Sequence, residues 1–309
     1  MQTVIALFAI LLLYVYVVSR ADTHRFVIKE YTFSSSKIKE PKTIVFLSDL
    51  HENEYEIKGE KYNEGLLRAI DGIAPDIILS GGDMLTSHKK PGRCRINELT
   101  DFFGRLAKKY PVFCANGNHE TRIYEKKSLY KNMYEEYEAG LCRRKVTVLK
   151  DKSRALNDIV ISGLEIPTKY YKSKSKKDFD ENVIKSKINE PSKDKFNILL
   201  CHDPAHFETA CSLSFDLVLS GHVHGGIAVL PYIGGVISTE RKLFPFYDGG
   251  LFLKVKTGEV VRHAVERMVY LNSGSQAMVI SRGLGMHTVN FRFNNPGELV
   301  VIKLVKESE

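Results

Sequence analysis

The sequence has few cysteines, only five among 309 residues. Five is an odd number and no Cys-x-x-Cys occurs, so the cysteines indicate neither a disulfide framework nor a zinc ribbon. Cys114 and Cys201 lie inside apolar runs and are expected to be small buried residues. This usage is more typical of a reducing compartment than of an oxidising one.

The first nineteen residues lack any charged side chain, and residues 4–18 are almost wholly aliphatic or aromatic. A run of this length can span a bilayer, although it is at the short end. A cleaved signal peptide is the alternative. Ser19-Arg20-Ala21 would serve as its cleavage site, but no Lys or Arg precedes the run. We expect a transmembrane anchor at residues 1–20, followed by one domain at residues 24–309.

Basic residues stand on only one side of this run, where Arg20, Arg25 and Lys29 follow it. The positive-inside bias therefore predicts a single-pass protein of the cell membrane whose main domain faces the cytoplasm.

The whole chain is basic, with a formal net charge of +8 and a pI near 9.0. The excess is either a solvated surface or an attraction to membrane headgroups, nucleic acid or phosphorylated substrates. Residues 168–195 are Lys-rich and have few apolar residues. They are either a solvated insertion, which we favour, or a basic lip for an anionic substrate or membrane.

Apolar runs and helical patterns alternate through the first half of the chain. The runs 43–47, 76–79 and 112–115 are typical of strands buried on both faces. Between them, residues 63–73 and 98–110 have helical spacing of apolar residues. This alternation predicts an α/β layered domain.

Two shorter segments carry predictions of their own. Residues 25–33 alternate partly with period two, which predicts a strand at a sheet edge. His206, near the start of a helix that Pro204 begins, is expected to be exposed and not a ligand.

Polar side chains follow the strands at their carboxyl ends, where open α/β sheets bind ligands. They are Asp49, His51, Asp83, Asn118, His119, His202, His222 and His224. With His119 set aside, the remaining seven are two carboxylates, one amide and four imidazoles, which suit manganese, iron, zinc, cobalt or nickel. Seven ligand-type side chains are too many for one ion with an open position. They suit two divalent ions that share a bridging carboxylate.

These motifs and their order resemble the calcineurin-like metallophosphoesterases. The motifs are Asp49-x-His51, Gly82-Asp83, Gly117-Asn118-His119-Glu120, His202 and Gly221-His222-Val223-His224, and they cover residues 43–226. Two later stretches, Ser281–Gly285 and Arg292–Pro296, resemble the membrane-anchored bacterial branch, which includes lipid-linked pyrophosphatases of the UDP-diacylglucosamine type. That branch usually has Pro-Glu where this chain has Pro296-Gly297-Glu298.

The resemblance implies a four-layer sandwich, in which two packed β-sheets are flanked by helices. It implies that one metal ion is held by Asp49, His51 and His224, and the other by Asn118, His202 and His222. Asp83 would bridge them, and His119 would be catalytic and lie over the substrate phosphate. Manganese is the first expectation for both ions.

The implied reaction is in-line attack of an activated water on phosphorus. A protein Ser/Thr phosphatase is not expected, because Met84-Leu85-Thr86-Ser87 stands where that branch has Val-Asp-Arg-Gly.

The first functional hypothesis is a membrane-anchored phosphohydrolase acting on a lipid-linked or amphiphilic phosphoester or pyrophosphate. A nuclease or cyclic-nucleotide phosphodiesterase is the alternative enzyme, although no basic stripe interleaved with aromatics favours nucleic acid. A non-catalytic scaffold on the same fold would be expected to have lost ligands, and none is lost. The sequence indicates no particular protein partner.

Overall fold

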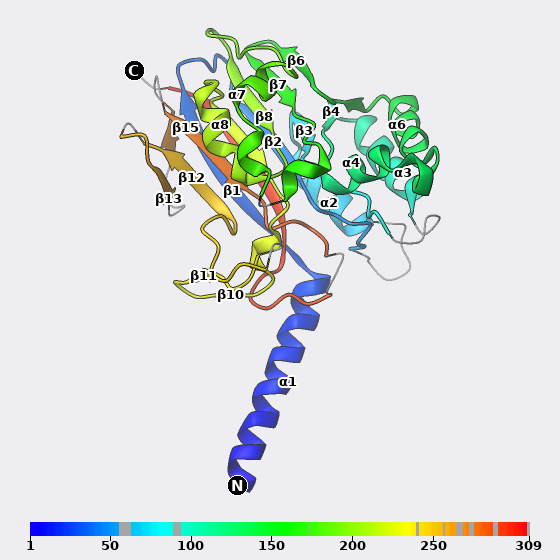
Figure 1. Ribbon diagram of the computed structural model, residues 1–309, viewed down its shortest axis with the longest axis vertical. Coiled ribbons are helices and arrows are strands. Elements are labelled where there is room, and N and C mark those ends of the chain that lie inside the picture. The colour runs from blue at the N-terminus through cyan, green and yellow to red at the C-terminus, as the bar shows by residue number, and fades with distance from the viewer. Residues whose placement is uncertain are drawn as a thin grey trace.

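The structure is a computed structural model of residues 1–309. It describes all of them except residues 56–62, 89–93, 173, 239–240, 256, 264–267, 272–274, 287–289 and 308–309. The described residues form two mixed seven-stranded sheets that pack face to face, and helices cover both outer faces (Figure 1). The predicted four-layer architecture is confirmed.

The first sheet has the strand order β14-β1-β16-β2-β3-β4-β5. Its strands are β1 (Phe26–Ser35), β2 (Lys42–Leu47), β3 (Ile77–Ser80), β4 (Val112–Cys114), β5 (Thr147–Val148), β14 (Val269–Tyr270) and β16 (Gly297–Lys306). Strands β2 to β5 are parallel, and β16 runs antiparallel to β2. The predicted strand at residues 25–33 exists, but its edge position is wrong. Strand β16, from the C-terminal part of the chain, pairs with β1 over its full length. On the other side of β1, β14 pairs with Phe33 and Ser34.

The second sheet has the order β13-β12-β15-β9-β8-β7-β6. Its strands are β6 (Lys152–Leu156), β7 (Ile159–Gly163), β8 (Phe196–Leu200), β9 (Leu217–Ser220), β12 (Gly250–Lys254), β13 (Val260–His263) and β15 (Gln276–Ile280). Strands β7, β8, β9 and β15 are parallel neighbours. Their carboxyl ends therefore share one edge of the sheet.

The apolar runs are continuous because both faces of the central strands are buried. In β2, Ile44 and Phe46 pack between the two sheets, while Val45 and Leu47 pack under helices. The helices over the first sheet are α2 (Glu64–Ile73), α3 (Ile96–Ala107), α4 (Asn118–Glu125), α5 (Lys127–Tyr130) and α6 (Met133–Arg143). The second sheet is covered by α7 (Glu181–Lys185) and α8 (Phe207–Ser212).

The Lys-rich segment 168–195 is more than the solvated insertion that its composition favoured. It forms two short 3₁₀ helices, η1 (Thr168–Tyr171) and η2 (Lys176–Asp178), followed by α7. Phe179, Ile184 and Ile188 are buried in the outer core of the second sheet. These buried apolar side chains hold the segment against the second sheet, although most of its other side chains are polar.

The same segment overturns the prediction for His206, which is buried. Its ring packs against Phe179, with ring centroids 4.9 Å apart. Helix spacing alone placed His206 on the surface, because the covering residue comes from a distant stretch of the chain.

Helix α1 (Gln2–His24) extends away from the domain (Figure 1). Its 23 residues give a length of about 34 Å at 1.5 Å per residue, and its most apolar 18-residue stretch has a mean hydropathy of 2.3. It is long and apolar enough to cross a membrane, as a signal sequence also is. Its last turn is part of the domain: buried Asp22 accepts a hydrogen bond from the Asn295 backbone N–H at 2.9 Å and pairs with Arg25.

Candidate metal centre

The predicted site residues all follow strand ends on one side of the sandwich. Asp49 and His51 follow β2, Asp83 follows β3, and Asn118 and His119 begin α4 after β4. His202 follows β8, and His222 and His224 follow β9. Five of these residues have positive φ angles between 49° and 71°: Asp49, His51, Asp83, His222 and His224. Non-glycine residues rarely adopt such angles, and local strain of this kind concentrates at functional sites.

Gly82 shows how closely the loops approach one another. Its φ is 97°, and a Cβ atom there would lie 2.1 Å from the backbone nitrogen of Gly117. Only glycine lets the loop after β3 and the loop after β4 come together, so Asp83 lies beside Asn118 and His119.

One ligand group consists of Asp49, His51 and His224. The distances to Asp49 Oδ1 are 4.0 Å from His51 Nε2 and 3.7 Å from His224 Nε2, and the two Nε2 atoms are 3.3 Å apart. Two atoms bound to the same ion at about 2.1 Å each cannot be more than about 4.2 Å apart. All three side chains could therefore hold one ion.

A second group consists of Asp83, His202 and His222. His202 Nε2 lies 3.1 Å from Asp83 Oδ2. The Oδ1 atom of Asn118 is buried and has no hydrogen-bond partner among the described residues. Buried polar atoms normally have a partner, and a bound cation would supply one here. Asp83 Oδ2 is also 3.9 Å from His51 Nε2, so this carboxylate lies between the two groups.

Backbone carbonyls orient two of the histidine rings. His202 Nδ1 lies 2.8 Å from the Gly81 carbonyl oxygen, and His224 Nδ1 lies 3.1 Å from that of Gly285. A carbonyl oxygen only accepts hydrogen bonds, so each Nδ1 must carry the proton. In the neutral form of each ring, Nε2 therefore directs a lone pair into the centre, as metal-ligating imidazoles do.

The carboxylates of the centre favour positive charge at His202, whereas burial lowers the pKa of His222 to about 4. Burial alone would lower the pKa of His202, but the carboxylates of Asp83 and Asp49 outweigh it and raise that pKa to about 10. Burial works to raise the pKa of Asp83, yet the nearby His202 and His119 hold it well below its usual range. A field that stabilises an imidazolium also stabilises a divalent cation. The donor set, its spacing and its charge thus fit two divalent ions.

His119 differs from His202 and His224 in its protonation. The Ser87 backbone N–H donates to His119 Nδ1 at 2.8 Å, so the ring proton must be on Nε2. Nε2 lies 4.0 Å from Asp83 Oδ2, at the edge of the centre. His119 therefore presents a proton donor rather than a lone pair, although its distances to His51 and Asp83 would also allow a ligand.

Glu120, the last residue of its motif, ties two loops together. Its carboxylate accepts backbone N–H bonds from Asp83 and Leu85 at 2.8 Å and from Gly117 at 3.0 Å. The motif pointed to this residue, but its role as a brace for the Asp83 loop needed the structure.

Sequence reasoning missed the supporting residues from the end of the chain. Buried Arg292 donates to the carbonyls of Arg282, Gly283 and Gly285, and so orders the loop that holds the His224 ring. Asn295 Nδ2 donates to the His224 carbonyl at 2.7 Å. Both residues lie in Arg292–Pro296, a stretch that resembles the membrane-anchored branch, and this resemblance was the one sign in the sequence that they matter.

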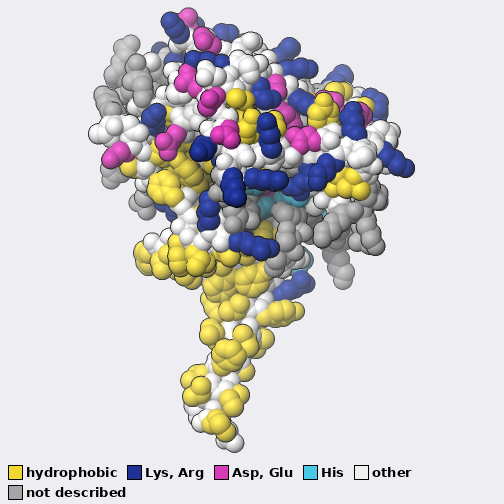
Figure 2. All heavy atoms as spheres, in the orientation of Figure 1, with side chains coloured by type: hydrophobic (Ala, Val, Ile, Leu, Met, Phe, Trp, Pro, Cys, Tyr) yellow, Lys and Arg dark blue, Asp and Glu magenta, His cyan; other side chains and the backbone are white. Residues whose placement is uncertain are grey.

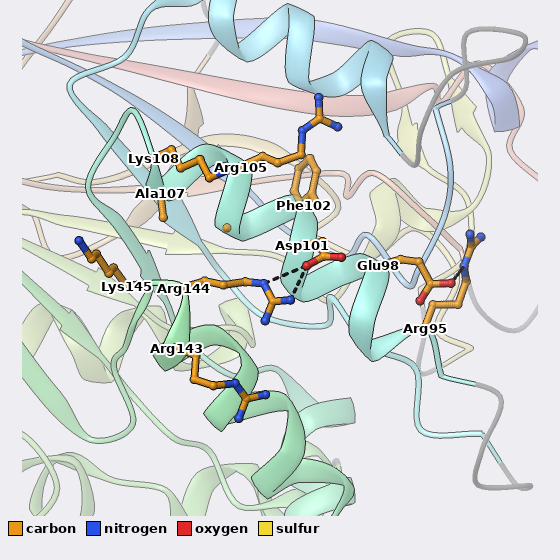
Figure 3. A pocket seen from close by; sticks show the side chains of 11 residues that line it. Arg95, Glu98, Asp101, Phe102, Arg105, Ala107, Lys108, Arg143, Arg144 and Lys145 are labelled. Atoms are coloured by element: carbon orange, nitrogen blue, oxygen red, sulfur yellow. Dashed lines mark hydrogen bonds and ion pairs between the residues drawn. The ribbon is translucent and has the colours of Figure 1, made fainter.

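Two large hollows, of about 970 and 1010 Å³, lie away from the candidate centre. One, of about 970 Å³, lies between α3 and α6 and has a lining rich in Arg and Lys (Figure 3). It contains no residue of the candidate centre, and some of its charges neutralise one another, as Arg144 does with Asp101. A smaller cavity of about 170 Å³ does adjoin the centre. Its lining includes His222, Lys176, Lys242, Phe246 and Tyr247.

Comparisons with known proteins agree with this geometry. Residues 42–226 match the profile of the family described as calcineurin-like phosphoesterase. An uncharacterized metallophosphoesterase of Helicobacter pylori strain J99 is 24% identical over 283 residues, which cover 91% of this chain and 65% of that protein. The uncharacterized metallophosphoesterase YkuE of Bacillus subtilis is 25% identical over 291 residues, covering 92% of this chain and 87% of YkuE.

The chain thus spans 65% of the length of the Helicobacter relative. Among solved structures, the NAD nucleotidase NadN of Haemophilus influenzae is similar over 79% of this chain and 45% of its own, with a TM-score of 0.35 and 16% identity. The family profile matches more than half of the chain and includes all eight residues of the candidate centre. The chain therefore belongs to the calcineurin-like phosphoesterase family, whose members use a dimetal centre.

Proposed function

We propose that this protein is a metal-dependent phosphohydrolase. The observation that carries the proposal is the pair of ligand groups that share Asp83 Oδ2, which is 3.1 Å from His202 Nε2 and 3.9 Å from His51 Nε2. Asp49, His51 and His224 would hold one divalent ion, and Asn118, His202 and His222 the other. Mixed oxygen and imidazole donors suit manganese, iron, zinc, cobalt or nickel, and manganese is our first choice among these metals.

When bound, a pair of divalent ions supplies Lewis acidity toward a phosphoryl group and lowers the pKa of a water molecule. The chain's own residues then have separate tasks. The buried carboxylates of Asp49 and Asp83 supply the negative charge that would hold the two cations. The His119 Nε2–H can donate a proton to the leaving oxygen as the P–O bond breaks.

We further propose that the substrate is amphiphilic, as a lipid-linked phosphoester or pyrophosphate of the UDP-diacylglucosamine type would be. The cavity beside His222 supports this, because its lining combines Lys242 with Phe246 and Tyr247, while its other lysine, Lys176, pairs with Asp203. Cationic and aromatic side chains together suit a ligand with a phosphate and an apolar portion.

A substrate panel with manganese tests this proposal. We expect phosphoesters in micelles or vesicles to have a higher kcat/KM than soluble analogues with the same headgroup, because a membrane-bound enzyme meets a concentrated substrate. The measurement is the rate at which each substrate of a matched pair is cleaved to its phosphomonoester product, with oligonucleotides as the control for nuclease activity. Equal kcat/KM within each pair would contradict the lipid-linked substrate, and preference for oligonucleotides would favour a nuclease.

Helix α1 is proposed to be an uncleaved anchor, with the domain on the cytoplasmic side of the cell membrane. Arg20 and Arg25 at the domain end of the helix support this orientation. Protease added to intact cells should leave the domain undigested, whereas protease added to lysed cells should digest it. A mature chain that begins near Ala21 or Asp22 would show a cleaved signal peptide instead.

A further inference from the structure

We propose that an apolar rim on the domain inserts into the same lipid leaflet that surrounds the domain end of α1. The rim consists of Tyr232, Ile233, Leu243, Phe244 and Phe246. The proposal rests on the membrane anchor and deepens the proposed function, because it specifies how a lipid-borne substrate would reach the metal centre.

The rim is unusually exposed for apolar side chains. Each of its five residues is at least 55% exposed, and all five fall within fifteen positions of the sequence. Single exposed apolar residues are ordinary on a protein surface, but a contiguous apolar patch marks an interaction site. The rim therefore needs a partner that covers it.

The two segments of the rim are held together by the backbone. Strands β10 (Val229–Leu230) and β11 (Gly234–Gly235) pair antiparallel and present Tyr232 and Ile233 at their turn. Leu243 forms a bridge with Ile237, and the Phe244 N–H donates to the Val236 carbonyl at 2.9 Å. The rim is thus one surface supported by a short sheet.

Helix α1 is connected to this surface by a chain of contacts. The Tyr14 ring of α1 packs edge-on against Phe293, with centroids 6.0 Å apart. The Phe293 backbone in turn forms hydrogen bonds with Ile227 and with Val229, the first residue of β10. In Figure 1, β10 and β11 lie beside the domain end of α1. In Figure 2, apolar side chains continue from the helix onto the foot of the domain.

These contacts set the depth of the rim. Tyr14 lies inside the apolar run of α1, four residues before Val18, which corresponds to about 6 Å along the helix. A bilayer that encloses residues 4–18 therefore reaches the level of Phe293. At that level, the neighbouring rim lies in the interface between headgroups and acyl chains.

Charge near the rim favours lipid over a second protein surface. Arg241 and Lys242 lie in the rim segment and are exposed. Figure 2 shows further Lys and Arg side chains gathered across the domain above the apolar foot. Basic residues next to exposed apolar ones match a leaflet with anionic headgroups.

The position of the rim has a consequence for the metal centre. Phe246 belongs to the rim and also lines the 170 Å³ cavity that contains His222. Insertion of the rim would therefore open this cavity at the level of the headgroups. A lipid with a phosphoester or pyrophosphate headgroup could reach the centre while its chains remain in the bilayer.

The absence of tryptophan from the sequence gives a direct test. The full chain carrying Phe244→Trp is reconstituted as single copies in lipid discs of phosphatidylcholine and phosphatidylglycerol, with bromine on the upper acyl chain. The matched control is Leu129→Trp, an exposed position on α5. We expect quenching for Phe244→Trp at least several-fold stronger than for Leu129→Trp. Weak quenching that is equal for the two variants would overturn the proposal. If the Trp at position 244 were shielded only in discs that hold two copies, the rim would be a dimer interface, which would also overturn it.

Activity provides the second arm. The double variant Leu243→Ser with Phe244→Ser, neither of which lines the cavity, is compared with Leu129→Ser. Burying two such side chains stabilises membrane contact by more than 1.4 kcal/mol, so roughly a ten-fold loss of kcat/KM is expected on vesicle-borne substrate. Hydrolysis of soluble bis(4-nitrophenyl) phosphate should not change. Equal losses on both substrates would overturn the proposal. A chain that is quenched but hydrolyses no phosphoester would contradict the proposed function alone.

Discussion

Asp83→Asn is expected to empty both ligand groups and to abolish hydrolysis. Its Oδ2 atom lies between the groups, and only a carboxylate supplies a full negative charge to two cations at once. Bound ions contribute several kcal/mol to the stabilisation of a phosphoryl transition state, so activity should fall by about three orders of magnitude or more. Elemental analysis should find close to two metal ions per wild-type chain and far fewer in the variant.

The folded structure should survive this change. Asp83 Oδ1 accepts the His119 backbone N–H at 2.7 Å, and the amide oxygen of asparagine can accept the same bond. Asp216→Asn is a matched control, because Asp216 is a mostly buried carboxylate that pairs with Lys37 and lies outside the centre. The control should keep both metal ions. An active Asp83→Asn variant with normal metal content would show that Asp83 does not bridge.

The candidate centre could be predicted from sequence because its signals are local. Each site residue lies within the few positions that follow an apolar run, as Asp49 does after β2 and His202 after β8. Within each sheet, parallel strands bring their carboxyl ends to one edge, so the sequence predicts that the residues after β2, β3 and β4 lie together, and likewise those after β8 and β9. That these two groups meet depends on how the two sheets pack, which only the structure shows. The order of the motifs then pointed to the family.

Long-range pairing and burial could not be predicted in this way. Strand β1 looked like an edge strand because nothing in its own pattern shows that β16 will pair with it. His206 looked exposed because Phe179, which covers it, comes from a stretch dominated by lysine. Arg292 was missed for the same reason: its carbonyl partners meet only in the folded loop.

The sequence predicted the long apolar helix α1 but gave no sign of the rim. Residues 4–18 form one continuous apolar run, which hydropathy detects. The rim residues stand singly or in pairs among glycine, proline and basic residues. Only the pairing of β10 with β11, and of Leu243 with Ile237, gathers them on one surface.

His119→Ala is expected to keep both metal ions and to lose most of the activity toward an alkyl phosphoester. The proposed role is donation of the Nε2 proton to the leaving oxygen, and general acid catalysis typically contributes about 10²–10⁴-fold. An alkoxide needs that proton, whereas a nitrophenolate leaves readily without it. The loss toward a nitrophenyl ester should therefore be much smaller. The measurement is kcat/KM for both esters beside elemental analysis.

Ser87→Ala gives the matched control for this prediction. It removes the hydroxyl that lies 2.8 Å from His119 Nδ1 but keeps the backbone N–H that fixes the ring proton on Nε2. Its effect should be small, and similar for both leaving groups. If His119→Ala lost the same factor on both esters, the ring would stabilise charge and not donate a proton. If metal were lost as well, His119 would be a ligand, and the proton on Nε2 would have to be assigned anew.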